Sequence, residues 1–238
     1  IIILQKIKMK ISIIIPCYNE EKTLNEIVNK VLCFKSFDKE LIIVDDCSSD
    51  NTEVIINDLV RKYDEIKTIR HDKNYGKGEG IKSGIKISTG DIILIQDADL
   101  EYNPEDYDNL IKPFLNANAD VVYGSRFLGG QYVKLSFFWH YVANKALTTF
   151  CNIFTNLNMT DMETGYKLFK SEAIKSIELN EKSFGIEPEI TIKLSKKKYI
   201  FYEVPISYSG RSYHEGKKIG LKDAFKAVYC IIRYRFFD

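Results

Sequence analysis

Short apolar segments alternate with segments of helical period over the first 125 residues of this 238-residue chain. The apolar segments are rich in β-branched residues, which favour strands, and they cover residues 11–15, 41–44, 66–69, 92–95 and 121–123. The segments with helical period cover residues 20–34, 52–63, 78–87 and 104–117. This alternation predicts an α/β fold with a doubly wound, mostly parallel sheet and flanking helices. In such sheets ligands bind beyond the carboxyl ends of the strands.

Polar residues follow four of the five predicted strands. The runs are Pro16-Cys17-Tyr18-Asn19-Glu20-Glu21, Asp45-Asp46-Cys47-Ser48-Ser49-Asp50, Asp97-Ala98-Asp99 and Gly124-Ser125-Arg126. Asn19 and Asp50 are also typical helix N-cap residues, which would give them a structural role instead. We expect all four runs to lie at one edge of the sheet, because the carboxyl ends of parallel strands meet there. An edge with this many acids indicates a cation or a sugar site.

Asp97 and Asp99 stand one residue apart, directly after a buried apolar strand. In an extended chain residues two apart point to the same side, so both carboxylates would face one ligand, and Glu101 would continue the alternation. Carboxylate ligands suit Mg²⁺ or Mn²⁺, which commonly carry the phosphates of a substrate. A strand end with solvated acids is the alternative. We therefore take Asp97, Asp99 and Glu101 as candidate metal ligands.

Charge and cysteine content exclude some classes of protein. A net charge of +1 argues against a nucleic-acid partner, which usually leaves a strongly basic domain. The five cysteines show no zinc spacing and are expected to be reduced thiols in a cytoplasmic setting. No apolar run reaches the length of a transmembrane helix or the pattern of a secretory signal. Met9 directly precedes the first strand, so we expect it to be the native start of a soluble or peripheral protein.

Two segments mix aromatic, apolar and basic residues. Residues 133–154 are aromatic-rich but include Lys134, His140 and Lys145, and either a core helix or a helix lying against lipid would fit. Residues 221–237 show the pattern more strongly, with four basic residues among large apolar ones, which favours a membrane-interfacial helix. We therefore expect a catalytic domain over residues 9–220 and a C-terminal amphipathic appendage over residues 221–238.

The motifs together resemble family 2 glycosyltransferases with the GT-A fold, and within them the polyprenyl-phosphate glycosyltransferases typified by dolichyl-phosphate mannose synthase. The resemblance covers about residues 11 to 220. It rests first on the four runs that follow the strands, with the run at residues 45–50 extended to Thr52 and the run at residues 97–99 extended to Glu101. It also rests on four further motifs: Asn74-Tyr75-Gly76-Lys77-Gly78, Asp161-Met162-Glu163-Thr164-Gly165-Tyr166-Lys167, Glu187-Pro188-Glu189 and Val204-Pro205-Ile206.

On the donor side, the resemblance implies a nucleotide diphosphate sugar, GDP- or UDP-linked, held with Mg²⁺ or Mn²⁺. Asp99 and Glu101 would ligate the metal, with Asp97 either ligating through water or holding the ribose or sugar. Glu101 departs from the family, which often has Gln there, and adds negative charge. The residues implied to line the nucleoside pocket are Pro16, Tyr18, Glu20, Val44, Asp46 and Ala98.

Several basic residues are candidates for phosphate binding. Arg126 follows a strand, and its planar fork can pair two phosphate oxygens. Arg211, Lys217 and Lys218 lie in a glycine-bearing loop that could close over the nucleotide, or form a solvated turn. The glycines at 76, 78 and 80 lack the Gly-Lys-Ser/Thr ending of a P-loop, so we expect a turn with close helix packing, with Lys77 near the nucleotide.

On the acceptor side, His140 and Lys145 are candidates to meet a lipid phosphate. Such a phosphate is already anionic, so no strong general base is required. Asp161 is the best candidate to orient the acceptor, or to take a proton if the acceptor is a hydroxyl; its alternative role is to cap a helix over residues 164–169. The resemblance implies a direct displacement with inversion at the anomeric carbon.

Three functions are compatible with the sequence. The first is metal-dependent transfer of a sugar to a polyprenyl phosphate (dolichyl or undecaprenyl) at the cytoplasmic face of a membrane, with or without a membrane-anchoring partner. The second is transfer to a sugar hydroxyl of a surface polysaccharide or glycolipid, and the lack of a clear general base argues against it. The third is a non-catalytic sugar-nucleotide or membrane-binding module, which would be expected to have lost Asp97, Asp99 or Arg126.

Overall fold

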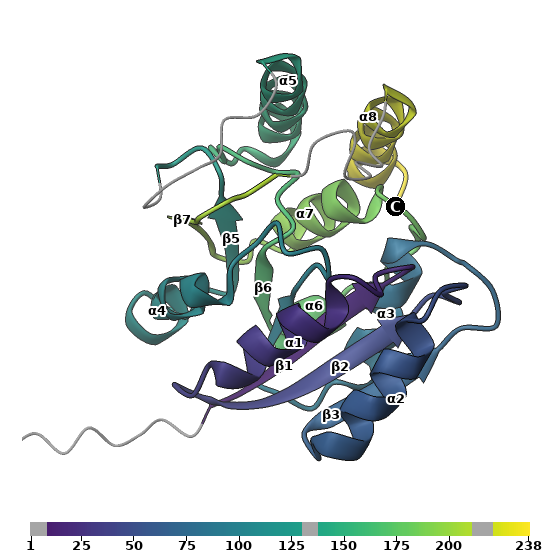
Figure 1. Cartoon of the computed structure of the whole chain (residues 1–238). Helices are drawn as coiled ribbons and strands as arrows, with labels where there is room; N and C mark the ends of the chain where they lie inside the picture. Colours follow the sequence, from purple (N-terminus) through teal and green to yellow (C-terminus); the bar gives the residue numbers. More distant parts are fainter. Residues whose placement is uncertain (1–8, 130–137, 211–220) are drawn as a thin grey trace, which may run out of the picture.

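A computed structural model describes residues 9–129, 138–210 and 221–238, and it contains one seven-stranded sheet in the order β3-β2-β1-β4-β6-β5-β7 (Figure 1). The strands are β1 (Lys10–Cys17), β2 (Asp38–Asp45), β3 (Ile66–Arg70), β4 (Ile92–Ile95), β5 (Val121–Ser125), β6 (Lys167–Lys170) and β7 (Phe201–Pro205). Neighbouring strands run parallel except at β6, which is antiparallel to both β4 and β5. The predicted α/β fold with a mostly parallel sheet is confirmed.

Helices cover both faces of the sheet. They are α1 (Leu24–Cys33), α2 (Thr52–Lys62), α3 (Lys77–Ile87), the 3₁₀ turn η1 (Pro104–Asp106), α4 (Tyr107–Asn116), α5 (Phe138–Thr155), α6 (Ser171–Lys175), α7 (Ile186–Lys196) and α8 (Leu221–Phe236). Along β1, Ile13 and Ile15 belong to the core shared with α1, α2 and α4, whereas Ile14 belongs to the core shared with α3, α7 and α8. This alternation of one strand between two cores is what a doubly wound sheet requires.

The helix α8 has two different faces. Cys230, Ile231 and Tyr234 are buried in the second core, where α8 packs against α7 and α5, and Ala227 is buried on the same helix. Phe225, at 76% exposed, and further aromatic residues lie on the outer face. One face of α8 is therefore part of the core, and the other face exposes apolar side chains.

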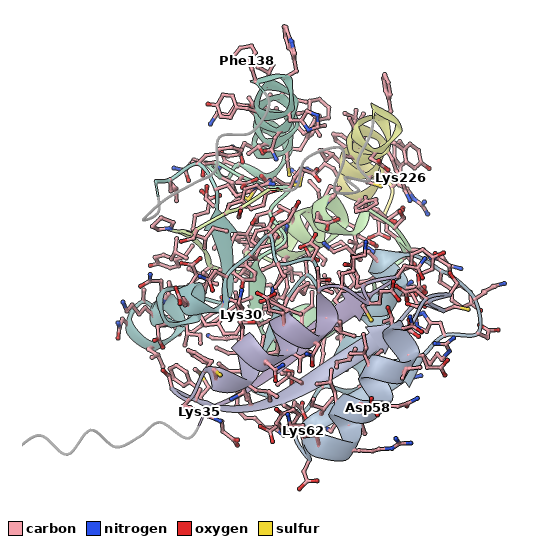
Figure 2. The ribbon with its side chains drawn as sticks, in the orientation of Figure 1. Lys30, Lys35, Asp58, Lys62, Phe138 and Lys226 are labelled. Carbon is pink, nitrogen blue, oxygen red and sulfur yellow. The ribbon has the colours of Figure 1, made fainter. Side chains whose placement is uncertain are left out.

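The rest of the protein covers only a narrow strip of α5, since the buried residues of this helix are Thr148 and Cys151. Phe138, at the exposed beginning of the helix (Figure 2), is 66% exposed and Trp139 is 75% exposed. The rings of Phe154 on α5 and Phe236 on α8 meet edge to face with their centroids 5.6 Å apart. Among the helices described outside the gaps at residues 130–137 and 211–220, none is long and apolar enough to cross a membrane.

Candidate active site

The antiparallel strand β6 brings a new segment to the edge where β1, β2, β4 and β5 end. Because β6 runs opposite to β4 and β5, its beginning lies at their carboxyl ends, and Lys167 is in register with both Ile95 and Tyr123. The segment that leads into β6 therefore reaches the acidic run after β4. A Cβ atom added to Gly165 would lie 2.3 Å from Asp97 Oδ2 and 2.7 Å from Tyr102 Cε2, so a larger residue would force these side chains to shift.

Asp97 is paired with a lysine from the glycine-rich turn. The ammonium of Lys77 lies 2.8 Å from Asp97 Oδ1 and 3.3 Å from Glu187 Oε1. Burial alone would lower the pKa of Lys77, but Asp97 and then Glu187 favour the charged form more strongly, so this pKa is raised. Lys77 thus stays protonated, and its two ion pairs connect α3 to the segment after β4 and to α7.

The chain turns after β4 and does not stay extended. Strand β4 ends at Ile95, and Leu100 has a φ of +63°. The predicted alternation of Asp97, Asp99 and Glu101 on one side of an extended chain is therefore wrong, because a left-handed residue separates the last two acids. Their proximity comes from the turn instead, in which the Glu101 amide donates to Asp99 Oδ1 at 3.2 Å.

Glu101 is held from the other side of the site. The Tyr208 hydroxyl donates to Glu101 Oε2 at 2.9 Å, and the Ser209 amide donates to the Glu101 carbonyl at 2.9 Å. In the part of the chain that the structure describes, no three His, Cys, Asp or Glu side chains are grouped closely enough to hold a metal ion by themselves. Asp99 and Glu101 still have the donor chemistry for Mg²⁺ or Mn²⁺, which take their other ligands from water and phosphate.

Asp46 orients the turn that presents Lys77. Its carboxylate accepts hydrogen bonds from the Tyr75 amide at 2.9 Å and from the Gly76 amide at 2.6 Å, and it lies 2.7 Å from His71 Nδ1. Gly76 has a φ of +99°, in the left-handed region that glycine tolerates best. The buried Asp46 side chain is thus committed to holding this turn.

The other residues predicted to line a nucleoside pocket differ in exposure. Val44 and Ala98 are buried, and the side chains of Pro16 and Val44 pack against Gly80 of α3. Tyr18 is 37% exposed at the end of β1. The carboxylate of Glu20 accepts a hydrogen bond from Thr23 Oγ1 at 2.8 Å. Within the predicted set, Tyr18 thus presents the most accessible ring surface.

Arg126 and Asp161 form a buried two-pronged ion pair. Arg126 Nε donates to Asp161 Oδ2 at 2.7 Å, and Nη2 donates to Oδ1 at 2.7 Å. Burial lowers the pKa of the guanidinium, but Asp161 offsets this and raises it well above its usual range. The guanidinium also lies 5.1 Å from the centroid of the Tyr208 ring. The two residues predicted separately as clamp and acceptor group are therefore one unit.

The alternative role of Asp161 as a helix cap is wrong, because the segment that follows it forms β6 over Lys167–Lys170 and not a helix. The amides of Thr160 and Asp161 donate to the Glu203 carboxylate of β7 instead. Asn19 and Asp50 do not occupy the N-cap positions, which are Thr23 for α1 and Asn51 for α2. Asp50 still accepts from the Thr52 amide at the beginning of α2.

Three residues at the centre of the site, Glu163, Lys167 and Glu187, lie in the motifs that carry the resemblance but were given no role from the sequence. Glu163 and Glu187 each have a buried carboxylate oxygen without a hydrogen-bond partner. Burial, and then the charge of Glu187, raises the pKa of Glu163, and burial lowers the pKa of the nearby Lys167. The sequence signal was a charged residue at both ends of the Thr164-Gly165-Tyr166 motif.

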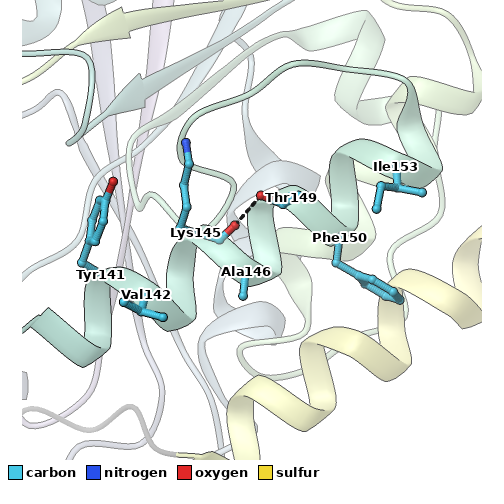
Figure 3. A pocket seen from close by; sticks show the side chains of 7 residues that line it. All are labelled: Tyr141, Val142, Lys145, Ala146, Thr149, Phe150 and Ile153. Atoms are coloured by element: carbon cyan, nitrogen blue, oxygen red, sulfur yellow. Dashed lines mark hydrogen bonds between the residues drawn. The ribbon is translucent and has the colours of Figure 1, made fainter.

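The acceptor-side candidates His140 and Lys145 lie on α5. Lys145 lines a shallow hollow of about 420 Å³ on α5, with Tyr141, Val142, Ala146, Thr149, Phe150 and Ile153 (Figure 3). The inner side of α5 contacts the segment that carries Asp161, because the Met162 amide donates to Thr148 Oγ1 at 3.1 Å. His140 lies in the first turn of α5. Arg211, Lys217 and Lys218 lie outside the described residues.

The sequence is similar to those of two named transferases. It is 31% identical over 228 residues to a dolichol-phosphate mannosyltransferase of Pyrococcus furiosus, covering 94% of this chain and 63% of that protein. It is 29% identical to a UDP-N-acetylglucosamine–dolichyl-phosphate N-acetylglucosaminyltransferase of Methanococcus voltae, covering 93% of this chain and 94% of that protein. The chain thus spans less than two thirds of the length of the first relative.

Solved structures with this fold include glucosyl-3-phosphoglycerate synthase from Mycobacterium tuberculosis. Its complex with Mn²⁺, UDP and phosphoglyceric acid superposes with a TM-score of 0.74 at 16% identity, covering 97% of this chain and 80% of that one. The same protein has been crystallised with Mg²⁺ and UDP, and that structure gives a TM-score of 0.70 at 18% identity, covering 95% and 79% of the two chains. At these identities the likeness shows the GT-A fold alone. The model of the glycosyl transferase family 2 matches residues 12–178, and the chain is therefore a family 2 glycosyltransferase.

Proposed function

We propose that this glycosyltransferase moves a sugar from a nucleotide diphosphate sugar, GDP- or UDP-linked, to a polyprenyl phosphate. The observation that carries the proposal is the position of α5. Its inner side contacts the segment holding Asp161, through Thr148 and the Met162 amide, while its outer side exposes Phe138 and Trp139. An acceptor with a charged head and an apolar tail matches a site built beside such a helix.

On the donor side, Asp99 and Glu101 would hold Mg²⁺ or Mn²⁺. Asp97 would either ligate the metal through water or hold the ribose or sugar. Bound there, the metal would neutralise charge on the leaving diphosphate. Tyr18 offers an exposed ring for the nucleoside base. Lys77 fixes Asp97 through the pair at 2.8 Å, so this carboxylate is oriented before a substrate arrives.

On the acceptor side, Arg126 would pair with the phosphate of the acceptor. Asp161 accepts both prongs of the guanidinium, which orients it but leaves Asp161 poorly placed to act as a base. A phosphate acceptor needs no base, because it is anionic at neutral pH. This favours direct displacement with inversion by a phosphate oxygen over attack by a sugar hydroxyl, which must lose a proton.

The protein would act as a peripheral protein on the cytoplasmic face of a membrane. The outer faces of α5 and α8 expose large apolar side chains, and Phe237 directly after α8 adds to them: Phe138, Trp139, Tyr141, Ile153, Phe225, Tyr229, Phe236 and Phe237. Lys145, Arg233 and Arg235 supply positive charge on the same two helices. Aromatic and basic side chains in this mixture suit an anionic lipid surface, with or without a membrane-anchoring partner.

The test is a panel of radiolabelled GDP- and UDP-sugars with polyprenyl phosphate, in Mn²⁺, in Mg²⁺ and in chelator. We expect label in the organic extract with one donor, and none in chelator or with Asp99→Ala. Asp58→Ala is the matched control, because that carboxylate is 69% exposed on α2. Label found only in water-soluble product would refute the lipid acceptor, and full transfer in chelator would refute the metal.

A further inference from the structure

The segment before α7 presses against the turn that presents Lys77. A Cβ atom at Gly76 would lie 2.5 Å from the Lys182 carbonyl oxygen, and one at Gly78 would lie 2.6 Å from the Glu181 carbonyl oxygen. The Glu79 amide also donates to the Lys182 carbonyl at 3.2 Å. Lys77 stands between the two glycines, so its position depends on where the backbone of residues 181–182 lies.

The side chain of Glu181 is held by α8. The Tyr234 hydroxyl donates to Glu181 Oε1 at 3.0 Å, and the ammonium of Lys226, labelled on α8 in Figure 2, lies 2.9 Å from Oε2. The Glu181 amide donates to Glu189 Oε2 of α7 at 2.8 Å. Tyr234 and Glu189 are fully buried, and Glu181 is 8% exposed. Glu181 is therefore clamped between α7 and α8.

The beginning of α7 depends on the same contacts. A Cβ atom at Gly185 would lie 2.8 Å from Glu181 Oε2 and 2.8 Å from Cys230 Sγ of α8. Two residues further along, Glu187 Oε1 lies 3.3 Å from the ammonium of Lys77. Glu181 thus stands next to both supports of Lys77: the backbone behind Gly76 and Gly78, and the helix that carries Glu187.

We propose that Glu181 is a positioning residue, through which α8 sets the placement of Lys77 between Asp97 and Glu187. The placement follows from the contacts alone, whereas its effect on turnover rests on the proposed function. The amphipathic helix would then have a second task besides presenting an apolar face, because contacts on α8 are relayed to the acidic edge of the sheet.

The first test measures the turn directly in the protein without substrates. Hydrogen exchange of the amides over residues 76–81 is compared in wild type, Tyr234→Phe, Glu181→Gln and Lys226→Met. We expect the amides to exchange about fivefold faster in the three variants, because the loss of one hydrogen bond shifts the equilibrium towards the locally opened state by about that factor. Tyr199→Phe is the matched control, since it removes a tyrosine hydrogen bond to Ser176 elsewhere, and its exchange over residues 76–81 should equal wild type.

The second test follows Lys77 itself by acylation with acetic anhydride, read by mass spectrometry. Loosening the turn should make Lys77 react faster in Tyr234→Phe and Glu181→Gln, while Lys30, paired with Glu26 on α1, reacts equally in all variants. Unchanged exchange over residues 76–81 together with unchanged Lys77 reactivity, while α8 itself exchanges faster, would overturn the proposal. Neither measurement needs sugar transfer, so failure of the proposed function leaves this test valid.

A third measurement separates positioning from anchoring. At saturating vesicles of phosphatidylcholine with phosphatidylserine, Tyr234→Phe should lower kcat about fivefold while the vesicle-bound fraction stays equal to wild type. A loss of bound fraction with kcat unchanged would show that Tyr234 serves attachment only, and it would refute the positioning role.

Discussion

Replacing Arg126 by Met leaves Asp161 buried without its partner. Asp161 has no solvent exposure, and it accepts two side-chain hydrogen bonds of 2.7 Å from Arg126. Removal of one member of a buried ion pair costs about 3–5 kcal/mol, mostly because the remaining charge is uncompensated. The Arg126 side chain is 16% exposed, so water can reach the vacated position, and we expect the lower end, about 3 kcal/mol.

The double replacement Arg126→Met with Asp161→Leu separates charge burial from packing. With both charges gone, no uncompensated charge stays buried. The further losses are the hydrogen bond from the Arg126 amide to Asp161 Oδ2 and the contact of the guanidinium with the Tyr208 ring, which together cost about 1–2 kcal/mol. The double variant should therefore be more stable than Arg126→Met alone, although neither variant should transfer sugar.

The assay is urea denaturation followed by far-ultraviolet circular dichroism, with the free energy of unfolding extrapolated to water. Fluorescence is less suitable, because the single tryptophan, Trp139, is 75% exposed on α5. A loss below about 1 kcal/mol for Arg126→Met, as exposed pairs give, would refute the reasoning. So would a double variant less stable than the single one.

Three further predictions concern single residues. Gly165→Ala should abolish transfer at a cost of about 1–3 kcal/mol in urea unfolding, because the new methyl group would displace Asp97. Burial raises the pKa of Glu163 to about 8, so ionisation costs stability as pH rises from about 4.3 towards that value; Glu163→Gln should match wild type at pH 4 and exceed it by about 1 kcal/mol or more at pH 9. Burial would raise the pKa of Glu40, but hydrogen bonds from Lys67, Ser12 and Thr89 lower it well below its usual range, so its stabilisation is present above about pH 4.3 and lost below. Glu40→Gln should cost about 2 kcal/mol at pH 7 and make melting temperature less sensitive to acid.

Much of the sheet could be predicted because its strands are short, apolar and separated by helical segments. The five expected strands correspond to β1 through β5, and the edge where four of them end does gather Asp46, Asp97, Asp99 and Arg126. The order of the strands in the sheet was harder to predict than the strands themselves. The Lys167–Lys170 strand is only four residues long and begins with a buried lysine, so no apolar run marks it, and its antiparallel insertion brings Gly165 to Asp97.

Side-chain pairing was the other limit. Arg126 and Asp161 are 35 residues apart, and each resembled an independent functional group. Lys77 was expected near a nucleotide, but its pairing with Glu187 depends on a contact across 110 residues. Leu100 gave no sign of its left-handed backbone, because that conformation is set by the turn and not by the residue type.

The two faces of α8 determine how the protein can sit on a surface. Phe225 and Tyr229 cannot move away from the domain unless Ile231 and Tyr234 leave the core. The helix α8 is therefore fixed to the domain and is not a flexible tether. If α8 binds lipid as proposed, the whole sheet would be held at the membrane in one orientation. The distance between the acidic edge of the sheet and the lipid would then be set by the fold, and the headgroup of a lipid acceptor would have to reach that edge.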